Sequence, residues 1–271
     1  EIGENERKPK IAHLIQYGFD TDVLEILLNE VYEYVDKFFI IESQVTHFGN
    51  VKKPLVWPLI SKQNRFKRFD HKIVYFNISS EMIEKYSDEH YLNKNSIWRN
   101  EDVQEIMRFQ MFLQWNKENN NYFSDDDIIG FGDVDEIPSF HNLILMKKCR
   151  LKNTTDIGIW FSHCQINKQW MSDFPVKGQR GTLGDPTYWY LRDAIQNGKP
   201  SRRRGHSKFF LLGGLHLTRY GYLPTMILKD LSMTEFEGGF MLSNLRKLLE
   251  QNVSLYDATK SIFYNDRCRF E

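Results

Sequence analysis

Two periods of hydrophobic and polar positions alternate along the first half of the chain. Four short apolar runs have the length and the β-branched and aromatic content of buried strands, and they lie at residues 11–16, 37–42, 72–77 and 127–132. Two longer segments repeat their apolar residues every three to four positions, at residues 20–34 and 98–117. This alternation of strands and helices predicts an α/β fold with a parallel, Rossmann-like sheet.

The helix predicted at residues 20–34 has both a start signal and an apolar stripe. Asp20 or Thr21 can act as the N-cap, because a short polar side chain accepts a hydrogen bond from the first free backbone N–H groups. The stripe that we expect to face the sheet consists of Val23, Ile26, Leu27, Val31 and Tyr34. A short helix is also predicted at residues 57–66.

The second half of the chain is less regular than the first. Residues 156–166 and 208–218 have the character of strands, and residues 241–251 and 254–263 have helical patterns. The segment at 170–205 is rich in Gly, Arg and aromatic residues, which predicts loops. No repeat or low-complexity linker divides the chain, so we expect one domain.

The strand predicted at residues 127–132 ends in an Asp-Val-Asp motif at residues 133–135. If the backbone stays extended there, Asp133 and Asp135 project to the same face. Carboxylate oxygens are the ligands that Mg²⁺ and Mn²⁺ prefer, and these ions usually share their coordination shell with substrate phosphates. Ligands of open α/β sheets lie beyond the carboxyl ends of the strands. The motif therefore predicts a metal–diphosphate site of the kind that holds the leaving group of a sugar nucleotide.

The same residues have a purely structural interpretation. Clusters of Asp, Gly and Pro mark turns, and Ser139 is well placed to cap a helix over the apolar stretch at 140–146. Glu136 would point away from the two aspartates in an extended chain, so we expect it to brace the loop.

Composition excludes several classes of function. The chain of 271 residues carries 36 basic and 36 acidic residues, so bulk charge does not favour nucleic acid or an anionic membrane as a partner. Three cysteines without C-x-x-C spacing form neither a disulfide scaffold nor a zinc module, and they favour a reducing compartment such as the cytoplasm. No apolar run reaches transmembrane length, so we expect no membrane contact from this chain itself. A Golgi lumen is the alternative location if an anchor precedes Glu1.

A series of sequence blocks has the order and content of a known family. The blocks are residues 24–30, 35–43 and 53–55, the single residues Thr46, Gly49, Trp98, Glu101 and Arg108, and residues 133–138, 213–216 and 232–236. They resemble glycosyltransferase family 17, the β-1,4-N-acetylglucosaminyltransferases that include the enzyme adding the bisecting N-acetylglucosamine to N-glycans. The resemblance runs from about residue 14 to 265 and is sparse between 150 and 205. Leu215 stands where the family usually has Trp, and Met233 where it often has His, which puts the family's acceptor recognition in question here.

The resemblance implies a fold of the GT-A type. A Rossmann-like nucleotide-binding half with a mostly parallel sheet, at about 11–138, would be fused to an irregular acceptor-binding half, at about 139–271, in one catalytic domain. It also implies a UDP-sugar donor, a glycan acceptor, a divalent metal and inversion at the anomeric carbon. The expected activity is transfer of N-acetylglucosamine from UDP-GlcNAc to a glycan hydroxyl.

Three residues are candidate metal ligands. Asp135 is expected to be the direct ligand, and Asp133 to make a water-mediated or ribose contact. His216 follows a Gly-Gly pair at a predicted strand end, where a histidine alone is more often a core or surface residue. The resemblance to GT-A enzymes implies that it is a further metal or diphosphate ligand. A neutral imidazole favours Mn²⁺ over Mg²⁺.

Further residues are candidates for the nucleotide-sugar site. Glu42 and Ser43 end the second predicted strand, where a nucleotide-binding sheet meets its base and ribose. Lys53 can reach a phosphate or remain solvated. Arg108 lies within a helix, where an ion pair is the default interpretation and the family match adds a structural or donor-site role. Arg204 belongs to a run of three arginines that is either a solvated face or a loop that closes over the diphosphate.

The expected reaction also needs a general base. An inverting single displacement needs one group that takes the proton of the acceptor hydroxyl. Glu235, which lies in a family-matched block, and Asp185, in a Gly-rich segment, are the two candidates, and the sequence does not decide between them.

One alternative function is a non-catalytic glycan- or nucleotide-binding module on the same fold. Another is a D-x-D phosphatase, which the mid-chain position of the motif and Ile137 at its Thr/Val position disfavour.

Overall fold

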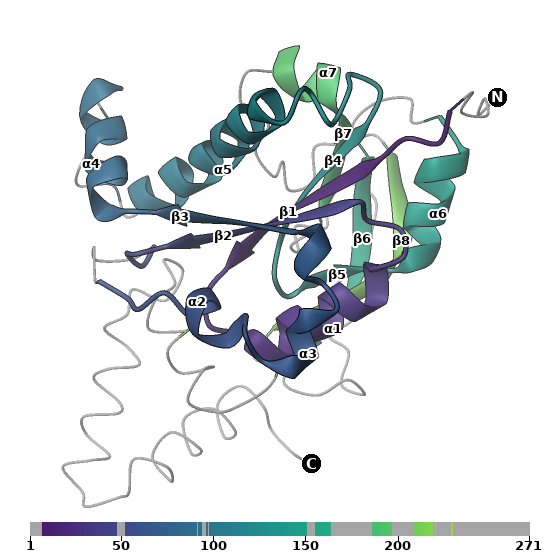
Figure 1. Cartoon of the computed structure of the whole chain (residues 1–271), viewed down its shortest axis with the longest axis horizontal. Helices are drawn as coiled ribbons and strands as arrows, with labels where there is room; N and C mark the ends of the chain where they lie inside the picture. Colours follow the sequence, from purple (N-terminus) through teal and green to yellow (C-terminus); the bar gives the residue numbers. More distant parts are fainter. Residues whose placement is uncertain are drawn as a thin grey trace, which may run out of the picture.

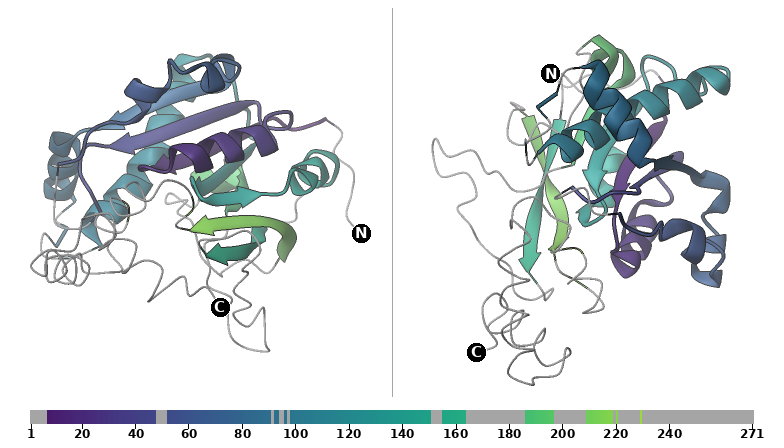
Figure 2. Two further views of the ribbon diagram at one scale, coloured as in Figure 1. Left: turned by 90° about the horizontal axis from the view of Figure 1, so that it is seen from below. Right: turned by 90° about the vertical axis from the view of Figure 1, so that its left-hand side faces the viewer.

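Three layers make up the described part of the molecule, with one sheet between two groups of helices (Figures 1 and 2). The computed structural model describes residues 7–47, 52–90, 92–93, 96, 98–150, 155–163, 186–196, 209–218, 220 and 229. The sheet has eight strands in the order β3-β2-β1-β4-β7-β6-β8-β5.

The four strands predicted in the first half form one side of this sheet. They are β1 (Ile11–Tyr17), β2 (Lys37–Ser43), β3 (Ile73–Ile78) and β4 (Ile128–Asp133). All three pairings between them are parallel, and the order β3-β2-β1-β4 is that of a Rossmann half. Gln16 at the end of β1 lies in register with Asp133 at the end of β4. The Asp-Val-Asp motif therefore begins at the carboxyl edge of β1 and β4.

The second half of the chain extends the same sheet. Its strands are β5 (Glu136–Pro138), β6 (Thr155–His163), β7 (Thr187–Tyr190) and β8 (Phe209–Thr218). Strand β7 is antiparallel to β4 and to β6, β6 is parallel to β8, and β5 is antiparallel to β8. The predicted α/β fold with a mostly parallel sheet is confirmed. The two predicted halves share one sheet, so the boundary near residue 138 does not separate two sheets.

Helices cover both faces of the sheet. One group comprises α1 (Thr21–Val31), α2 (Trp57–Ile60), α3 (Asn64–Lys67) and α6 (Phe140–Lys148). The other comprises α4 (Ser80–Glu89), α5 (Arg99–Glu118) and α7 (Leu191–Gln196). A 3₁₀ turn at Asp70–Lys72 precedes β3. Among the helices that the structure describes, none combines the length and apolar character that a membrane crossing requires.

The core divides into two clusters because side chains alternate across β1. Ile11 and Ile15 pack with the α1 side, whereas Ala12 and Leu14 pack with the α5 side. Phe39 of β2 also faces α5, with its ring 5.1 Å from that of Phe112 and nearly perpendicular to it. Each fully buried side chain of this size stabilises the fold by roughly 1.5–3 kcal/mol. Both sheet faces are thus covered, which leaves the strand ends for a site.

Helix α1 differs from its prediction in three respects. It ends at Val31, three residues before the predicted end. Asp20 holds the N-cap position but makes no side-chain cap bond, because its carboxylate is engaged elsewhere. Ile26 is 38% exposed, whereas Leu24 and Leu28 are fully buried. The buried face is broader than a single stripe because α1 packs against both the sheet and α6.

Two further expectations need correction, and one is confirmed. The helix predicted at 57–66 is two short helices, α2 and α3. Within 170–205, the described residues form β7 and α7 rather than loops, because the aromatic residues of β7 are buried against the sheet. Ser139 caps α6 as predicted, its side chain accepting from the His141 N–H. The helical patterns at 241–251 and 254–263 lie outside the described residues.

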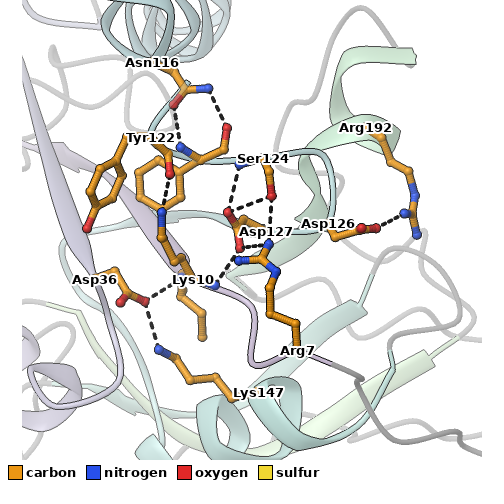
Figure 3. A network of polar contacts seen from close by, with 12 residues as sticks. Arg7, Lys10, Asp36, Asn116, Tyr122, Ser124, Asp126, Asp127, Lys147 and Arg192 are labelled. Atoms are coloured by element: carbon orange, nitrogen blue, oxygen red, sulfur yellow. Dashed lines mark hydrogen bonds and ion pairs between the residues drawn. The ribbon is translucent and has the colours of Figure 1, made fainter. Parts of the chain in front are cut away.

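A polar network ties together the amino ends of the strands, at the edge opposite the Asp-Val-Asp motif (Figure 3). Asp127, fully buried just before β4, accepts from Arg7 and from the Lys10 backbone N–H, both at 2.7 Å. Asp36, just before β2, accepts from the Ile11 N–H at 2.8 Å and from Lys147 at 2.9 Å. These charge-assisted bonds fix the relative positions of β1, β2 and β4.

Candidate active site

The Asp-Val-Asp motif forms a turn between β4 and β5. Strand β4 ends at Asp133, Val134 and Asp135 are in the turn, and β5 begins at Glu136. The expected extended backbone is therefore wrong at the second aspartate. The Val134 N–H donates to the Gln16 carbonyl at 3.2 Å, and the Asp135 carbonyl accepts from the Leu217 N–H at 2.8 Å. These two contacts with β1 and β8 hold the turn in place.

Buried polar side chains hold this turn in place through hydrogen bonds. Glu136 is fully buried, and its Oε2 accepts from the Asp133 N–H at 3.0 Å, which is the bracing role expected from the sequence. Arg108 of α5 is also fully buried and donates to the Gly132 carbonyl at 3.1 Å and to Glu105 at 2.8 Å. The last residue of β4 is therefore positioned by contacts on both of its sides.

Four side chains converge beside the turn, and we call them the Asp135 cluster: Asp20, Asp135, His216 and Lys229. Lys229 Nζ lies 2.6 Å from Asp135 Oδ2 and 3.2 Å from Asp20 Oδ2. His216 Nε2 lies 3.3 Å from the same Asp135 oxygen. Asp20 comes from the start of α1, Asp135 from the turn and His216 from β8. Both carboxylates are buried, at 3% and 4% exposure.

Electrostatic effects keep this cluster charged. Burial by itself raises the pKa of Asp135, but the adjacent Lys229 and His216 hold that pKa well below its usual value. Burial raises the pKa of Asp20, with Lys229 opposing and Asp135 adding to the rise. Burial disfavours the ammonium form of Lys229, but Asp135 and Asp20 raise its pKa above the usual value. At neutral pH the cluster therefore holds an ionised Asp135 against a protonated Lys229.

Two glycines bring His216 to the cluster. Gly213 and Gly214 have φ angles of 132° and 131°, a region that residues with a side chain rarely adopt. The register between β6 and β8 shifts at this point, which is the pattern of a β-bulge. Beyond it, His216 lies opposite Glu136 of β5. The Gly-Gly pair seen in the sequence thus bends β8 at the position that directs the histidine to the motif.

A second buried polar pair lies deeper, between β1 and β7. Tyr188 Oη and His13 Nδ1 share a hydrogen bond of 3.1 Å. A Cβ at Gly130 would lie 2.5 Å from the Tyr188 ring, so the pair requires glycine there. Burial, with Arg108 acting in the same direction, lowers the pKa of His13 to about 3. The imidazole therefore stays neutral in the folded protein at any pH near neutrality.

This lowered pKa predicts a specific acid sensitivity. Below a pH of about 6.5 the unfolded chain binds a proton at His13 that the folded chain does not bind, so stability falls as the pH decreases towards about 3. We expect His13→Asn to lose less unfolding free energy than the wild type between pH 7 and 4, by several kcal/mol. Denaturant unfolding at each pH measures this change in unfolding free energy. His71→Asn, at an exposed histidine, should keep the wild-type slope, and an equally steep slope in His13→Asn would contradict the assignment.

Glu42 and Lys53, predicted to contact the nucleotide sugar, are paired with each other at 3.3 Å. Glu42 is fully buried and also accepts from the backbone N–H groups of Val56 at 2.6 Å and Trp57 at 3.1 Å, and from Tyr75 Oη at 3.1 Å. Their side chains hold the segment that follows β2. These contacts give both residues a role in loop structure, and the donor contact expected from their position stays a prediction.

Ser43 and Arg108 are likewise buried, at 3% and 0% exposure. Ser43 Oγ accepts from the Val45 N–H at 3.2 Å, and Arg108 supports Gly132. The contacts of Arg108 give it a positioning role at the end of β4, and the donor contact expected for it stays a prediction. The hydrophobic pattern of the sequence predicted the end of β2 and the helix α5. It did not indicate which polar side chains of these elements face solvent.

Three predicted site residues lie outside the described part of the chain, and two residues of the Asp135 cluster were not predicted from the sequence. Asp185, Arg204 and Glu235 lie outside the described residues. Asp20 and Lys229 were missed. Asp20 had one usable signal, since it follows the carboxyl end of β1 closely, but its polar side chain before a helix also fits an N-cap. Lys229 belongs to no motif that separates it from the other lysines.

A neighbouring polar group was also missed. Gln16 Nε2 lies 2.6 Å from His47 Nε2 and donates to Gln104 Oε1 at 3.0 Å. His47 Nδ1 lies 3.7 Å from Glu101. Because Gln16 is in register with Asp133, this group lies at the same sheet edge as the motif. It offers hydrogen-bond donors and acceptors next to the Asp135 cluster.

Comparison with known proteins gives the family. The model of glycosyltransferase family 17 matches residues 2–161, which is more than half of the chain. A search of curated proteins found no match. The solved structure titled "Crystal structure of 4-diphosphocytidyl-2C-methyl-D-erythritol synthase" aligns with a TM-score of 0.40 and 10% identity, over 78% of this chain and 91% of that chain. The resemblance predicted from the sequence blocks is confirmed: the chain belongs to glycosyltransferase family 17 and is a glycosyltransferase.

Proposed function

We propose that this glycosyltransferase moves N-acetylglucosamine from UDP-GlcNAc to a hydroxyl of a glycan, with inversion and with a divalent metal ion, preferably Mn²⁺. The observation that carries the proposal is the convergence of Asp20, Asp135 and His216 beside Asp133 at the carboxyl edge of β1 and β4. That edge is where open α/β sheets bind nucleotides.

The donor groups of the Asp135 cluster support the metal. Two carboxylates and an imidazole form the mixed oxygen and nitrogen set that suits Mn²⁺. Asp20 Oδ1 is buried and has no hydrogen-bond partner in the described part of the chain, so it is available as a ligand. In the described residues no three such groups are already spaced to enclose an ion, and Lys229 lies between the two carboxylates. When bound, the ion would neutralise the charge that develops on the diphosphate leaving group.

The chain's own residues would orient the donor. Asp135 stays ionised because Lys229 and His216 stabilise its charge. Asp133, whose backbone N–H is held by Glu136, presents its carboxylate at the strand end for a water-mediated or ribose contact. The polar group of Gln16, His47, Glu101 and Gln104 supplies hydrogen-bonding partners for the nucleoside. Arg204 remains a candidate for a phosphate contact.

Calorimetric titration of UDP into the protein, once with Mn²⁺ and once with a chelator, tests the donor site. We expect binding with Mn²⁺ and little or none with the chelator. A transfer assay with UDP-GlcNAc and a panel of glycans then tests the activity, and NMR of the product reports the anomeric configuration. Absence of UDP binding in both conditions would contradict the proposal, and a product that retains the donor configuration would contradict the inversion.

A pair of variants identifies the general base. We propose that Glu235 or Asp185 takes the proton of the acceptor hydroxyl while the bond to UDP breaks. Replacing the true base should lower kcat by about 10²–10⁴-fold and leave the affinity for UDP unchanged, because the base acts on the acceptor. Glu235→Gln and Asp185→Asn serve as each other's control. Wild-type rates in both variants would place the base at another residue.

A further inference from the structure

We propose that the ammonium of Lys229 is a built-in cation that occupies the position between Asp20 and Asp135 which the divalent ion takes, so that metal binding requires Lys229 to leave. The inference deepens the function proposed above and rests on its metal-binding site. It predicts that the metal affinity of the protein is limited by an internal competitor.

The geometry of Lys229 is that of a bridging cation. Its Nζ contacts one oxygen of each carboxylate, at 2.6 Å for Asp135 and 3.2 Å for Asp20. The two acids come from different elements, the turn after β4 and the start of α1. Both are almost completely buried, so their mutual repulsion is poorly screened by water. A positive charge between them therefore holds the two elements together.

The atoms that Lys229 contacts are also the atoms that a divalent ion would use. Carboxylate oxygens coordinate such ions at about 2.0–2.2 Å. An ion at this distance from Asp135 Oδ2 would lie close to Lys229 Nζ, and the two cations would repel strongly. Asp135 Oδ2 is also the oxygen nearest His216. The ammonium and the metal therefore compete for the same oxygen, and the repulsion between two cations disfavours their binding there together.

One buried atom indicates that the cluster can accept a larger cation. Among the residues that the structure describes, Asp20 Oδ1 has no hydrogen-bond partner although it is buried, whereas Asp20 Oδ2 contacts Lys229. Leaving a carboxylate oxygen buried without a partner costs free energy. A divalent ion has several coordination positions and can engage oxygens that a single ammonium leaves without a partner. The unsatisfied oxygen is the feature that distinguishes this cluster from an ordinary structural ion pair.

The test is a calorimetric titration of MnCl₂ into three forms of the full chain: wild type, Lys229→Met and Lys147→Met. Lys147 is the matched control, because it also pairs with a carboxylate, that of half-buried Asp36 at 2.9 Å, but at the opposite end of the strands. We expect Lys229→Met to bind Mn²⁺ at least about tenfold more tightly than the wild type, since no ammonium must be displaced. Lys147→Met should match the wild type.

A second measurement covers instability of the variant. Without metal, Lys229→Met leaves two buried acids without their shared cation, so its melting temperature should fall. Saturating MnCl₂ should raise that temperature more in the variant than in the wild type, because at one concentration a ligand that binds the folded state more tightly stabilises it more. Lys229→Gln, which keeps a hydrogen-bond donor but no charge, should behave like Lys229→Met.

The outcomes separate this inference from the proposed function. Equal or weaker Mn²⁺ affinity in both Lys229 variants overturns the inference, and the proposed function stands if the wild type transfers sugar only with Mn²⁺. Absence of Mn²⁺ binding in all forms, with transfer continuing in a chelator, overturns the metal site and the inference together and leaves sugar transfer. Absence of transfer with tighter binding in the variants overturns the function and supports the competition.

Discussion

Asparagine in place of Asp135 is expected to lower sugar transfer by about 10³-fold or more and to leave the fold intact. In the proposed mechanism a bound metal would supply several kcal/mol of charge stabilisation at the leaving group, and about 4 kcal/mol corresponds to a factor of 10³ in rate. Asparagine has nearly the same shape but no charge. The folded state tolerates it because Lys229 keeps its ion pair with Asp20, and one buried negative charge is removed. Transfer rates and melting temperatures of the purified variant measure both effects.

A matched asparagine variant controls for the loss of any carboxylate. Asp126 is an exposed residue at the other end of β4, where it pairs with Arg192, and Asp126→Asn should transfer at the wild-type rate. Asp133→Asn should fall between the two, since that residue is proposed to act through water or on the ribose. A near-normal rate in Asp135→Asn would remove the motif from the reaction and return it to the role of a structural turn.

The largest effect on stability is expected from Arg108→Met, at about 3–5 kcal/mol of unfolding free energy. Its guanidinium is fully buried, donates to the Gly132 carbonyl and to Glu105, and lies 5.5 Å from the Phe131 ring. Methionine fills much of the volume but removes the donors and leaves the Glu105 carboxylate without this counter-charge. Equilibrium unfolding in denaturant measures the loss.

A double variant distinguishes charge loss from packing loss. Adding Glu105→Gln to Arg108→Met removes the carboxylate that faced the guanidinium, so part of the lost stability should return. If the double variant is as unstable as the sum of the two single variants, the pair makes no coupled contribution. A loss of less than about 1 kcal/mol in Arg108→Met alone would contradict the bracing role beneath β4.

Local patterns accounted for much of the fold. The four parallel strands and the long helix α5 appear at the expected positions to within one or two residues, because alternation and helical periodicity reflect burial on one face of each element. Ser139 was also recognised as a cap, because capping involves only residues that are close to one another in the sequence. The Asp-Val-Asp motif was found because both aspartates lie within three residues of each other at a strand end.

Other features of the site left no local pattern. Asp135 and Lys229 are 94 residues apart, and Asp20 joins them from a third segment. Nothing in the spacing of residues encodes such contacts, because they depend on how the strands are ordered in the sheet. Glu42 and Arg108 were predicted to contact the donor because the sequence pattern located the elements that carry them. The pattern did not show that the packing of neighbouring segments buries their side chains.

By itself, the sequence determined the class of fold, the family and the pair of aspartates at the end of β4, since each depends on short-range periodicity or a contiguous motif. Only the tertiary structure decided that the motif is a turn, that Asp20 joins Asp135 and His216, and that a lysine ammonium lies among them. The physical reason is that burial and charge pairing are set by the surroundings of each group in space. Those surroundings come from segments that are distant along the chain.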